Sequence, residues 1–137
     1  MTHDEEIRPE PDAELDALAH AVIGAAIEVH QTLGPGLDEA LYQAALCIEL
    51  RLRGIDYAKQ VIVEVEYKGE PIGEKRLDLL VGGRLIVELK AVESIAPLHK
   101  AQVLTYEKIT RLRLGILINF NCTLLKDGIR RIINNSI

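Results

Sequence analysis

Three charged residues within an apolar stretch carry the clearest chemical signal in this sequence: Asp78, Glu88 and Lys90. They lie in residues 76–90, whose pattern predicts two apolar strands joined by a glycine turn. A charge among buried side chains must be paired or bound to a metal, because its removal from water costs free energy. Carboxylate oxygens are the ligands of hard divalent cations, and an ammonium group beside such a cation suits metal-assisted hydrolysis of a phosphodiester.

The hydrophobic pattern of these strands predicts how they pair. Side chains alternate between the two faces of a strand. One apolar face is therefore expected from Leu77, Leu79 and Val81 on the first strand and from Leu85, Val87 and Leu89 on the second. Burying both sets together requires Leu79 opposite Val87, because a shift by one residue would turn one set to the wrong side. This register places Asp78 opposite Glu88, with Lys90 two residues along on the same face.

The predicted register also determines the length of the loop between the strands. It needs an odd number of residues, most simply Gly82-Gly83-Arg84, with glycine at a position of positive φ. A two-residue turn would put the two carboxylates on opposite faces. A simpler interpretation of the same charges is a salt bridge from Lys90 or Arg76 at a sheet edge, which would contribute little to stability.

The rest of the sequence predicts an α/β (α+β) fold, a central mixed sheet flanked by helices in the order ααβββαβ(β). Helices are expected over residues 12–32, 38–53 and 98–110, and further strands over 61–67, 114–120 and 129–133. The expected core residues of the second helix are Leu41, Ala44, Ala45, Ile48 and Leu52.

Length and composition predict one domain in a reducing compartment. The 137 residues suffice for a single core that buries roughly two-thirds of the unfolded surface. No apolar run approaches the length of a membrane span, and the first residues lack the order of a secretory signal. Two cysteines without metal-type spacing favour a cytoplasmic location.

The net charge of −5 is concentrated at the N-terminus. Residues 1–16 hold seven acids and one base, so that removing them from 21 acids and 16 bases leaves 14 and 15, a charge of +1. We expect an acidic flexible tail over residues 1–11 and a single domain over residues 12–137. A nearly neutral domain allows nucleic-acid binding but predicts no strong, salt-dependent grip on duplex DNA.

Polar residues of the helix over 98–110 have a spacing that suits a site. Gln102 and Tyr106 are four apart and project from one face, with His99 one turn earlier. Gln102 could bond a metal-bound water or a phosphate, and Tyr106 could donate to a phosphate oxygen. The alternative is an ordinary, half-exposed polar helix face.

Glu39 and Tyr42 form a second such group, three residues apart at the start of the helix over 38–53. A glutamate in the first turn also suits the helix dipole, which is the alternative explanation. Tyr42 is expected to lie partly in the core.

Five segments, taken together, form a specific combination of motifs. The first is His30-x-x-Leu33-Gly-Pro-Gly-Leu-x-Glu39-x-x-Tyr42-x-x-Ala45-Leu46. The others are Arg76-Leu-Asp78-Leu-Leu-Val, Ile86-Val-Glu88-Leu-Lys90-Ala-Val-Glu93, His99-x-Ala-Gln102-x-Leu-x-Tyr106 and Gly115-x-Leu-Ile-Asn119-Phe-Asn121. In this order they resemble the GxxExxY protein family, over nearly the whole chain after the tail. That family is placed within the PD-(D/E)XK nuclease-like superfamily, so the resemblance implies a restriction-endonuclease-like core.

The resemblance also implies roles for individual residues. Asp78 and Glu88 correspond to metal ligands, Glu39 to the helix-borne acid that completes the metal site, and Lys90 to the charged group near the attacked phosphate. Gln102 and Tyr106 match the Gln-x-x-x-Tyr signature of the nuclease modules of recombination-type helicase–nucleases.

The resulting hypothesis is a Mg²⁺- or Mn²⁺-dependent nuclease that acts on DNA. The backbone carbonyl of Leu89 is expected among the ligands, and Arg76, His99 and Tyr42 are expected to bind the substrate. The alternative is a non-catalytic module of the same fold that binds nucleic acid or a protein. A core this short often needs a homodimer or a partner protein to hold its substrate. A small-molecule-binding α/β protein has less support, because no Gly-rich phosphate loop is present.

Overall fold

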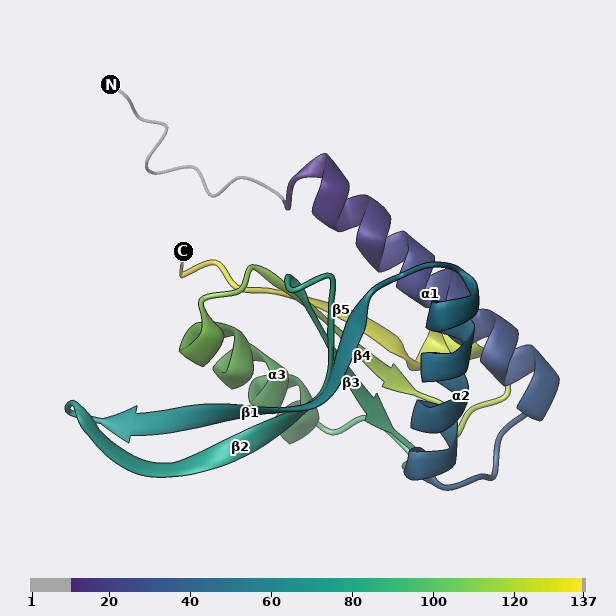
Figure 1. Ribbon diagram of the computed structural model, residues 1–137. Helices are drawn as coiled ribbons and strands as arrows, with labels where there is room; N and C mark the ends of the chain where they lie inside the picture. The colour runs from purple at the N-terminus through teal and green to yellow at the C-terminus, as the bar shows by residue number, and fades with distance from the viewer. Residues whose placement is uncertain (1–10, 137) are drawn as a thin grey trace.

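The computed structural model describes residues 11–136, which form three α-helices and a five-stranded mixed sheet (Figure 1). The elements are α1 (Ala13–Leu33), α2 (Glu39–Leu52), β1 (Tyr57–Tyr67), β2 (Glu70–Val81), β3 (Leu85–Lys90), α3 (Pro97–Thr110), β4 (Leu114–Asn119), the short 3₁₀ helix η2 (Leu125–Gly128) and β5 (Ile129–Ile133). Neighbouring strands follow the chain order from β1 to β5, and only β3 and β4 pair in parallel. This order confirms the predicted fold class.

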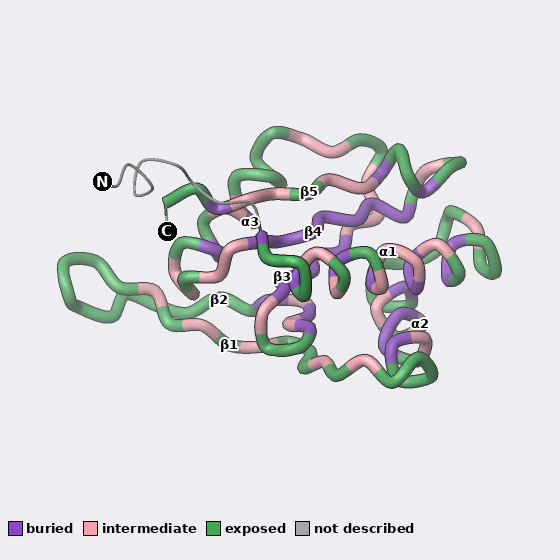
Figure 2. Tube along the Cα trace, turned by 90° about the horizontal axis from the view of Figure 1, so that it is seen from above, coloured by how far each residue is buried: buried purple, intermediate pink, exposed green. Residues whose placement is uncertain are grey.

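Two apolar clusters occupy the two faces of the sheet. The larger cluster joins α1 and α2 to one face of β2, β3 and β4. The smaller joins Leu77, Ile86 and Tyr106, so α3 covers the opposite face. Figure 2 shows the most buried segments at β3 and β4, whereas the outer part of the β1–β2 hairpin is exposed. The domain therefore has a rigid centre and a protruding hairpin.

The predicted pairing of the two central strands is confirmed. Leu79 lies opposite Val87, and Val81 opposite Leu85. The loop between them is Gly82-Gly83-Arg84, with φ of 59° at Gly82 and 70° at Gly83. These left-handed conformations suit glycine, which lacks the Cβ that would clash. The N–H of Arg84 donates to the carbonyl of Val81 at 3.1 Å and closes the turn.

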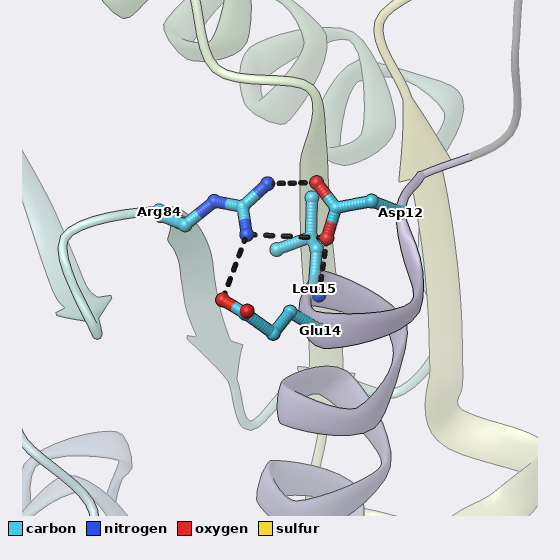
Figure 3. A network of polar contacts seen from close by, with 4 residues as sticks. All are labelled: Asp12, Glu14, Leu15 and Arg84. Carbon is cyan, nitrogen blue, oxygen red and sulfur yellow. Dashed lines mark hydrogen bonds and ion pairs between the residues drawn. The ribbon is translucent and has the colours of Figure 1, made fainter.

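The turn is also tied to the start of α1 (Figure 3). Asp12 caps α1 by accepting the Leu15 N–H at 2.8 Å. The Arg84 guanidinium donates to both oxygens of the Asp12 carboxylate and lies 3.9 Å from Glu14. The hydrogen bond from Arg84 has the largest effect on the pKa of Asp12, followed by that from the Leu15 N–H, and the pKa is lowered to about 2. One carboxylate therefore holds both a helix end and the hairpin that carries the central acids.

One expectation about β2 is wrong: Leu77 does not share a cluster with Leu79 and Val81. Leu79 and Val81 lie in the larger cluster, whereas Leu77 packs with Ile86 and Tyr106 on the α3 side. The change of face occurs where Lys59 pairs with Leu79 and Val61 with Leu77, which leaves Gln60 between them at φ 53°. The register of the pairing is the same on both sides of Gln60, so the change of face on β2 lies beside a residue of β1 with positive φ.

The predicted core face of α2 is also wrong. Leu41, Ile48 and Leu52 are 51%, 48% and 74% exposed. The buried residues are instead Tyr42, Leu46, Cys47 and Leu50. The ring of Tyr42 stacks on Phe120 with centroids 4.4 Å apart. Because α2 has apolar residues around most of its circumference, this aromatic contact, and not the periodicity, determines the face that is buried.

Other boundaries agree with the sequence to within a few residues, although β1 begins at Tyr57 and β2 at Glu70, both earlier than expected. Within the described residues, no helix has the length and hydropathy needed to span a membrane. The predicted acidic tail over residues 1–11 lies outside the described residues, apart from Pro11, which is buried.

Candidate functional site

The carboxylates of Asp78 and Glu88 lie side by side where β2 separates from β3. Backbone pairing between these strands ends at Leu79 and Val87. Beyond this pair, the N–H of Asp78 donates to Oε1 of Glu88 at 2.8 Å, and the N–H of Leu89 donates to Oδ2 of Asp78 at 2.8 Å. Each acid therefore replaces a backbone acceptor on the opposite strand. The predicted register brings the two acids together.

Burial and mutual repulsion keep a proton on this acid pair. Glu88 is only 8% exposed, and burial, followed by the charge of Asp78, raises its pKa to about 8. Burial also raises the pKa of Asp78. The interaction between the two neighbouring carboxyl groups favours a proton on one of them. A bound cation could replace that proton.

Lys90 lies close to the acid pair, two residues after Glu88 on β3. Its charge lowers the pKa of Asp78, Glu88 and Glu39, although burial outweighs this effect at each of them. The backbone of Lys90 is fixed from the other side, because its carbonyl accepts the Phe120 N–H at 2.9 Å. An ammonium group is thus held beside the position that a cation would occupy.

Glu39 approaches the pair from the first turn of α2. Its pKa is raised by burial and then by the charge of Asp78. Even so, no group of three His, Cys, Asp or Glu side chains converges on one point among residues 11–136. Glu39 is therefore a neighbour of the acid pair, and its role as a metal ligand stays a prediction.

Tyr42 positions this helix and is not available to a substrate. The residue is fully buried, contrary to the expected contact with substrate. Its hydroxyl donates to the carbonyl of Gly34 at 2.5 Å and accepts the N–H of Leu37 at 3.2 Å. These bonds hold the loop that precedes α2, and with it the start of the helix, where Glu39 lies.

Tyr106 connects α3 to the acid pair. It is 8% exposed, and its pKa is raised by burial and then by the charges of Glu88 and Asp78. Gln102, one turn earlier, is half-buried and lines a hollow together with Tyr106. The structure thus places Tyr106 near the acids and Gln102 beside Tyr106.

The other two residues expected at the substrate lie at the edge of this region. His99 accepts the N–H of Ala96 at 3.0 Å through Nδ1, so it closes the first turn of α3. Arg76 is exposed on β2, where it pairs with Ile62 of β1. Contact of either side chain with substrate stays a prediction.

The oxygen atoms at this site suit a hard divalent cation. Asp78 and Glu88 each use one oxygen for a backbone N–H, and their remaining oxygens have no backbone donor among the described residues. The two polar groups of a strand residue point to the same side, so the carbonyl of Leu89 faces β2 as its N–H does. Mg²⁺ commonly binds one or two carboxylates and completes its octahedron with water and phosphate oxygens. The residues present therefore fit such an ion without a third carboxylate.

Asn119 has a positioning role that the sequence did not reveal. Its buried amide accepts the N–H of Val92 at 3.0 Å and donates to the carbonyl of Val92 at 2.9 Å. It also accepts the N–H of Asn121 at 3.2 Å. The chain just after Lys90 is thereby fastened to the end of β4. The only signal was an asparagine at the end of an apolar run.

We expect Asn119→Ala to destabilise the protein by about 2 kcal/mol, because the Val92 N–H loses its side-chain acceptor and the Val92 carbonyl loses the shorter of its two side-chain hydrogen bonds. Urea unfolding followed by circular dichroism measures this difference. Asn135→Ala, a change at an exposed asparagine, serves as the control. Equal unfolding midpoints for the two variants would show that the Val92 contacts contribute nothing.

Glu107 is a second residue that sequence reasoning missed. It is fully buried on α3, and neither carboxyl oxygen has a hydrogen-bond partner among the described residues. Burial raises its pKa to about 8. It packs against Gly115 of β4, where a Cβ atom would lie 2.5 Å from Oε2 of Glu107. Gly115 therefore makes room for this carboxyl group.

Comparison with known proteins agrees with this geometry. Residues 16–132 match the sequence model of a family described as the PD-(D/E)XK nuclease superfamily, which covers more than half of the chain. No curated protein matches the chain.

Proposed function

Because the chain belongs to the PD-(D/E)XK nuclease superfamily, we propose that it is a Mg²⁺- or Mn²⁺-dependent nuclease that hydrolyses phosphodiester bonds in DNA. We further propose that it belongs to the GxxExxY proteins, whose motif corresponds to Gly36, Glu39 and Tyr42. The observation that carries the proposal is the pair of Asp78 and Glu88 beside Lys90, in which each acid accepts a backbone N–H of the opposite strand.

A divalent cation would be held by the free oxygens of Asp78 and Glu88 and by the Leu89 carbonyl. Such an ion lowers the pKa of a bound water and neutralises charge on the attacked phosphate. Glu39 would orient a water molecule at the edge of the site. Its place at the start of α2, close to Asp78 and Lys90, supports this role.

Lys90 and Tyr106 would act on the substrate directly. The ammonium of Lys90 would stabilise the charge that develops on the phosphate oxygens. The hydroxyl of Tyr106, near Asp78 and Glu88, would donate to a phosphate oxygen, and Gln102 would orient the same group. His99 would support this arrangement by closing the first turn of α3. Arg76 would contact the DNA backbone from the exposed hairpin.

Cleavage assays test the proposed activity. Purified protein is mixed with single-stranded, duplex and branched DNA in the presence of Mn²⁺ or Mg²⁺. The proposal predicts cleavage of at least one substrate, and its loss in Asp78→Asn and Lys90→Ala. The proposal would be contradicted if the wild type cleaved none of the three substrates, or if the two variants cleaved DNA as fast as the wild type.

Metal affinity should rise with pH. The ion and the proton compete for Glu88, whose pKa is about 8 in the metal-free protein. The affinity for Mn²⁺ is therefore expected to increase by about tenfold per pH unit below that value and to level off above it. Calorimetric titration from about pH 6 to about pH 9 measures this dependence, because this range lies on both sides of the Glu88 pKa. An affinity that does not change with pH would exclude Glu88 as a ligand.

A non-catalytic module that binds nucleic acid or a protein is the second candidate. It is favoured by the missing third ligand, since no three acidic, His or Cys side chains converge in the part of the chain described by the structure. The same titration separates the two candidates. Metal binding in the millimolar range or tighter, abolished in Glu88→Gln, supports the nuclease, whereas no binding supports the module.

Two further features of the molecule, its cysteines and an exposed face of α2, bear on its location and its partners. We propose a cytoplasmic protein because both of its cysteines, Cys47 and Cys122, are free. A second copy or a partner protein would help to hold DNA, and the exposed apolar residues Leu41, Ile48 and Leu52 of α2 provide a surface for it.

A further inference from the structure

A hollow of about 330 Å³ lies between the β1–β2 hairpin and α3. Val65 and Lys75 line it from the hairpin, and Leu98, Ala101, Thr105 and Ile109 line it from the helix, together with the two residues of the proposed site on α3. Its volume is at the lower end of the range of about 300–1,000 Å³ that is typical of small-ligand pockets. Leu98 is 67% exposed, so the apolar wall of the hollow faces solvent. We call this feature the hairpin hollow.

The hairpin hollow shares two residues with the proposed site. Gln102 and Tyr106 form part of its wall, and Tyr106 also interacts electrostatically with Asp78 and Glu88. A polymer whose phosphate lay at the acid pair would therefore place an adjacent unit in or beside the hollow. The hairpin, which supplies Val65 and Lys75 to the lining, protrudes beside α3 (Figure 1).

We propose that the hairpin hollow binds one unpaired nucleobase of DNA, next to the phosphate at the acid pair. This inference rests on the proposed function and deepens it, because it makes DNA with unpaired nucleotides the substrate class. A base inside a duplex is stacked and paired, so its face cannot enter an apolar hollow unless the base is flipped out. A single strand presents each base without that cost.

The lining of the hollow matches the chemistry of a nucleotide. Its apolar side chains and the ring of Tyr106 suit the face of a base, which is recognised by stacking and not by sequence. The amide of Gln102 can bond to a base edge. Lys75 supplies a positive charge for the phosphate, and no acidic residue is among those that line the hollow. The charge of the hollow is therefore complementary to DNA, although the whole protein has a net charge of −5.

The test measures DNA binding separately from cleavage. All measurements use the full chain with Glu88→Gln and no metal, so that DNA stays intact. Fluorescence anisotropy compares a short oligothymidylate, the same oligomer with one abasic residue at each position in turn, and a duplex of equal length. Ala101→Phe fills the hollow from an exposed helix position, and Ala17→Phe, at an exposed position of α1, is the matched control.

We expect the single strand to bind more tightly than the duplex. One abasic position and Ala101→Phe should each weaken binding by about tenfold, the effect of losing one stacked base, while Ala17→Phe changes it less than about twofold. The proposal would be overturned if the protein bound the duplex as tightly as the single strand, or if Ala101→Phe left the affinity for the single strand unchanged. So would a change of oligomeric state in Ala101→Phe with DNA affinity unchanged, which would assign the hollow to a protein contact. Because no metal is used, these results do not depend on whether the wild-type protein cleaves DNA.

Discussion

Replacing Glu88 with glutamine is expected to slow DNA cleavage by about 10³-fold and to stabilise the metal-free protein at pH 8. The loss of activity follows from the loss of a ligand, because a neutral amide oxygen holds a divalent cation less well than a carboxylate does. The gain in stability follows from the burial of Glu88, which is 8% exposed and has its pKa raised to about 8.

The direction of the stability change follows from proton linkage. The folded metal-free protein holds the proton of Glu88 up to a pKa of about 8, whereas the unfolded chain releases it near 4.5. The stability contributed by the protonated group is therefore complete below pH 4.5 and is lost as the pH rises towards 8. Glutamine resembles the protonated acid, since its amide can donate to Asp78 while its carbonyl accepts the Asp78 N–H.

Two measurements on the same variant check this prediction. Cleavage rates are measured with Mn²⁺ at saturating DNA, and thermal unfolding is followed at several pH values with a chelator present. Glu64→Gln, a change at an exposed glutamate on β1, is the control. A variant that cleaves normally, or that unfolds at lower temperature than the wild type at pH 8, would contradict the role given to Glu88.

The second large effect is expected at Glu107, which does not belong to the proposed site. In the wild type, the free energy of unfolding should fall as the pH rises from about 4.5 to about 8. Glu107→Gln should abolish this fall. The folded protein keeps this carboxyl group protonated up to a pKa of about 8, so stability falls as the pH rises through this interval. Each pH unit corresponds to about 1.4 kcal/mol, and the total is therefore several kcal/mol, up to about 5.

The measurement is the free energy of unfolding in urea at low and high pH. Glu28→Gln, at an exposed helical glutamate, is the matched control and should leave the pH dependence unchanged. Glu107→Gln should be more stable than the wild type at pH values above about 8, where the wild-type group ionises without a partner. Parallel pH profiles for the wild type and Glu107→Gln would show that this carboxyl group is solvated or paired in solution.

The central part of the fold could be predicted because several local signals agree there. The apolar alternation on β2 and β3 and the two glycines at 82–83 point to one register, and that register alone brings Asp78 next to Glu88. Strand alternation has a period of two, so an error of one residue would have exposed an entire apolar set. Function and burial thus depend on the same pairing.

The errors occurred where local pattern does not determine packing. Apolar side chains lie on most sides of α2, and its buried face follows from the stacking of Tyr42 on Phe120, a contact between distant parts of the chain. Leu77 changes cluster beside Gln60, a residue of the paired strand with positive φ. Neither contact leaves a signal in the periodicity of the sequence.

The polar residues that the sequence did not reveal share a similar cause. Glu107 follows Tyr106 directly and looks like any helical glutamate until α3 is placed against Gly115. Asn119 stands at the end of an apolar strand, and its bonds to Val92 exist only because β4 runs parallel to β3. Both roles are consequences of packing between elements.

The most direct measurement of the central claim is a crystal structure of the protein grown with Mn²⁺, with the ion located by its anomalous scattering. The account predicts one strong peak about 2 Å from a carboxylate oxygen of Asp78 and from one of Glu88, with the Lys90 ammonium nearby. A structure with no peak there at high Mn²⁺ concentration, or with the ion bound elsewhere and the two carboxyl groups unliganded, would contradict it.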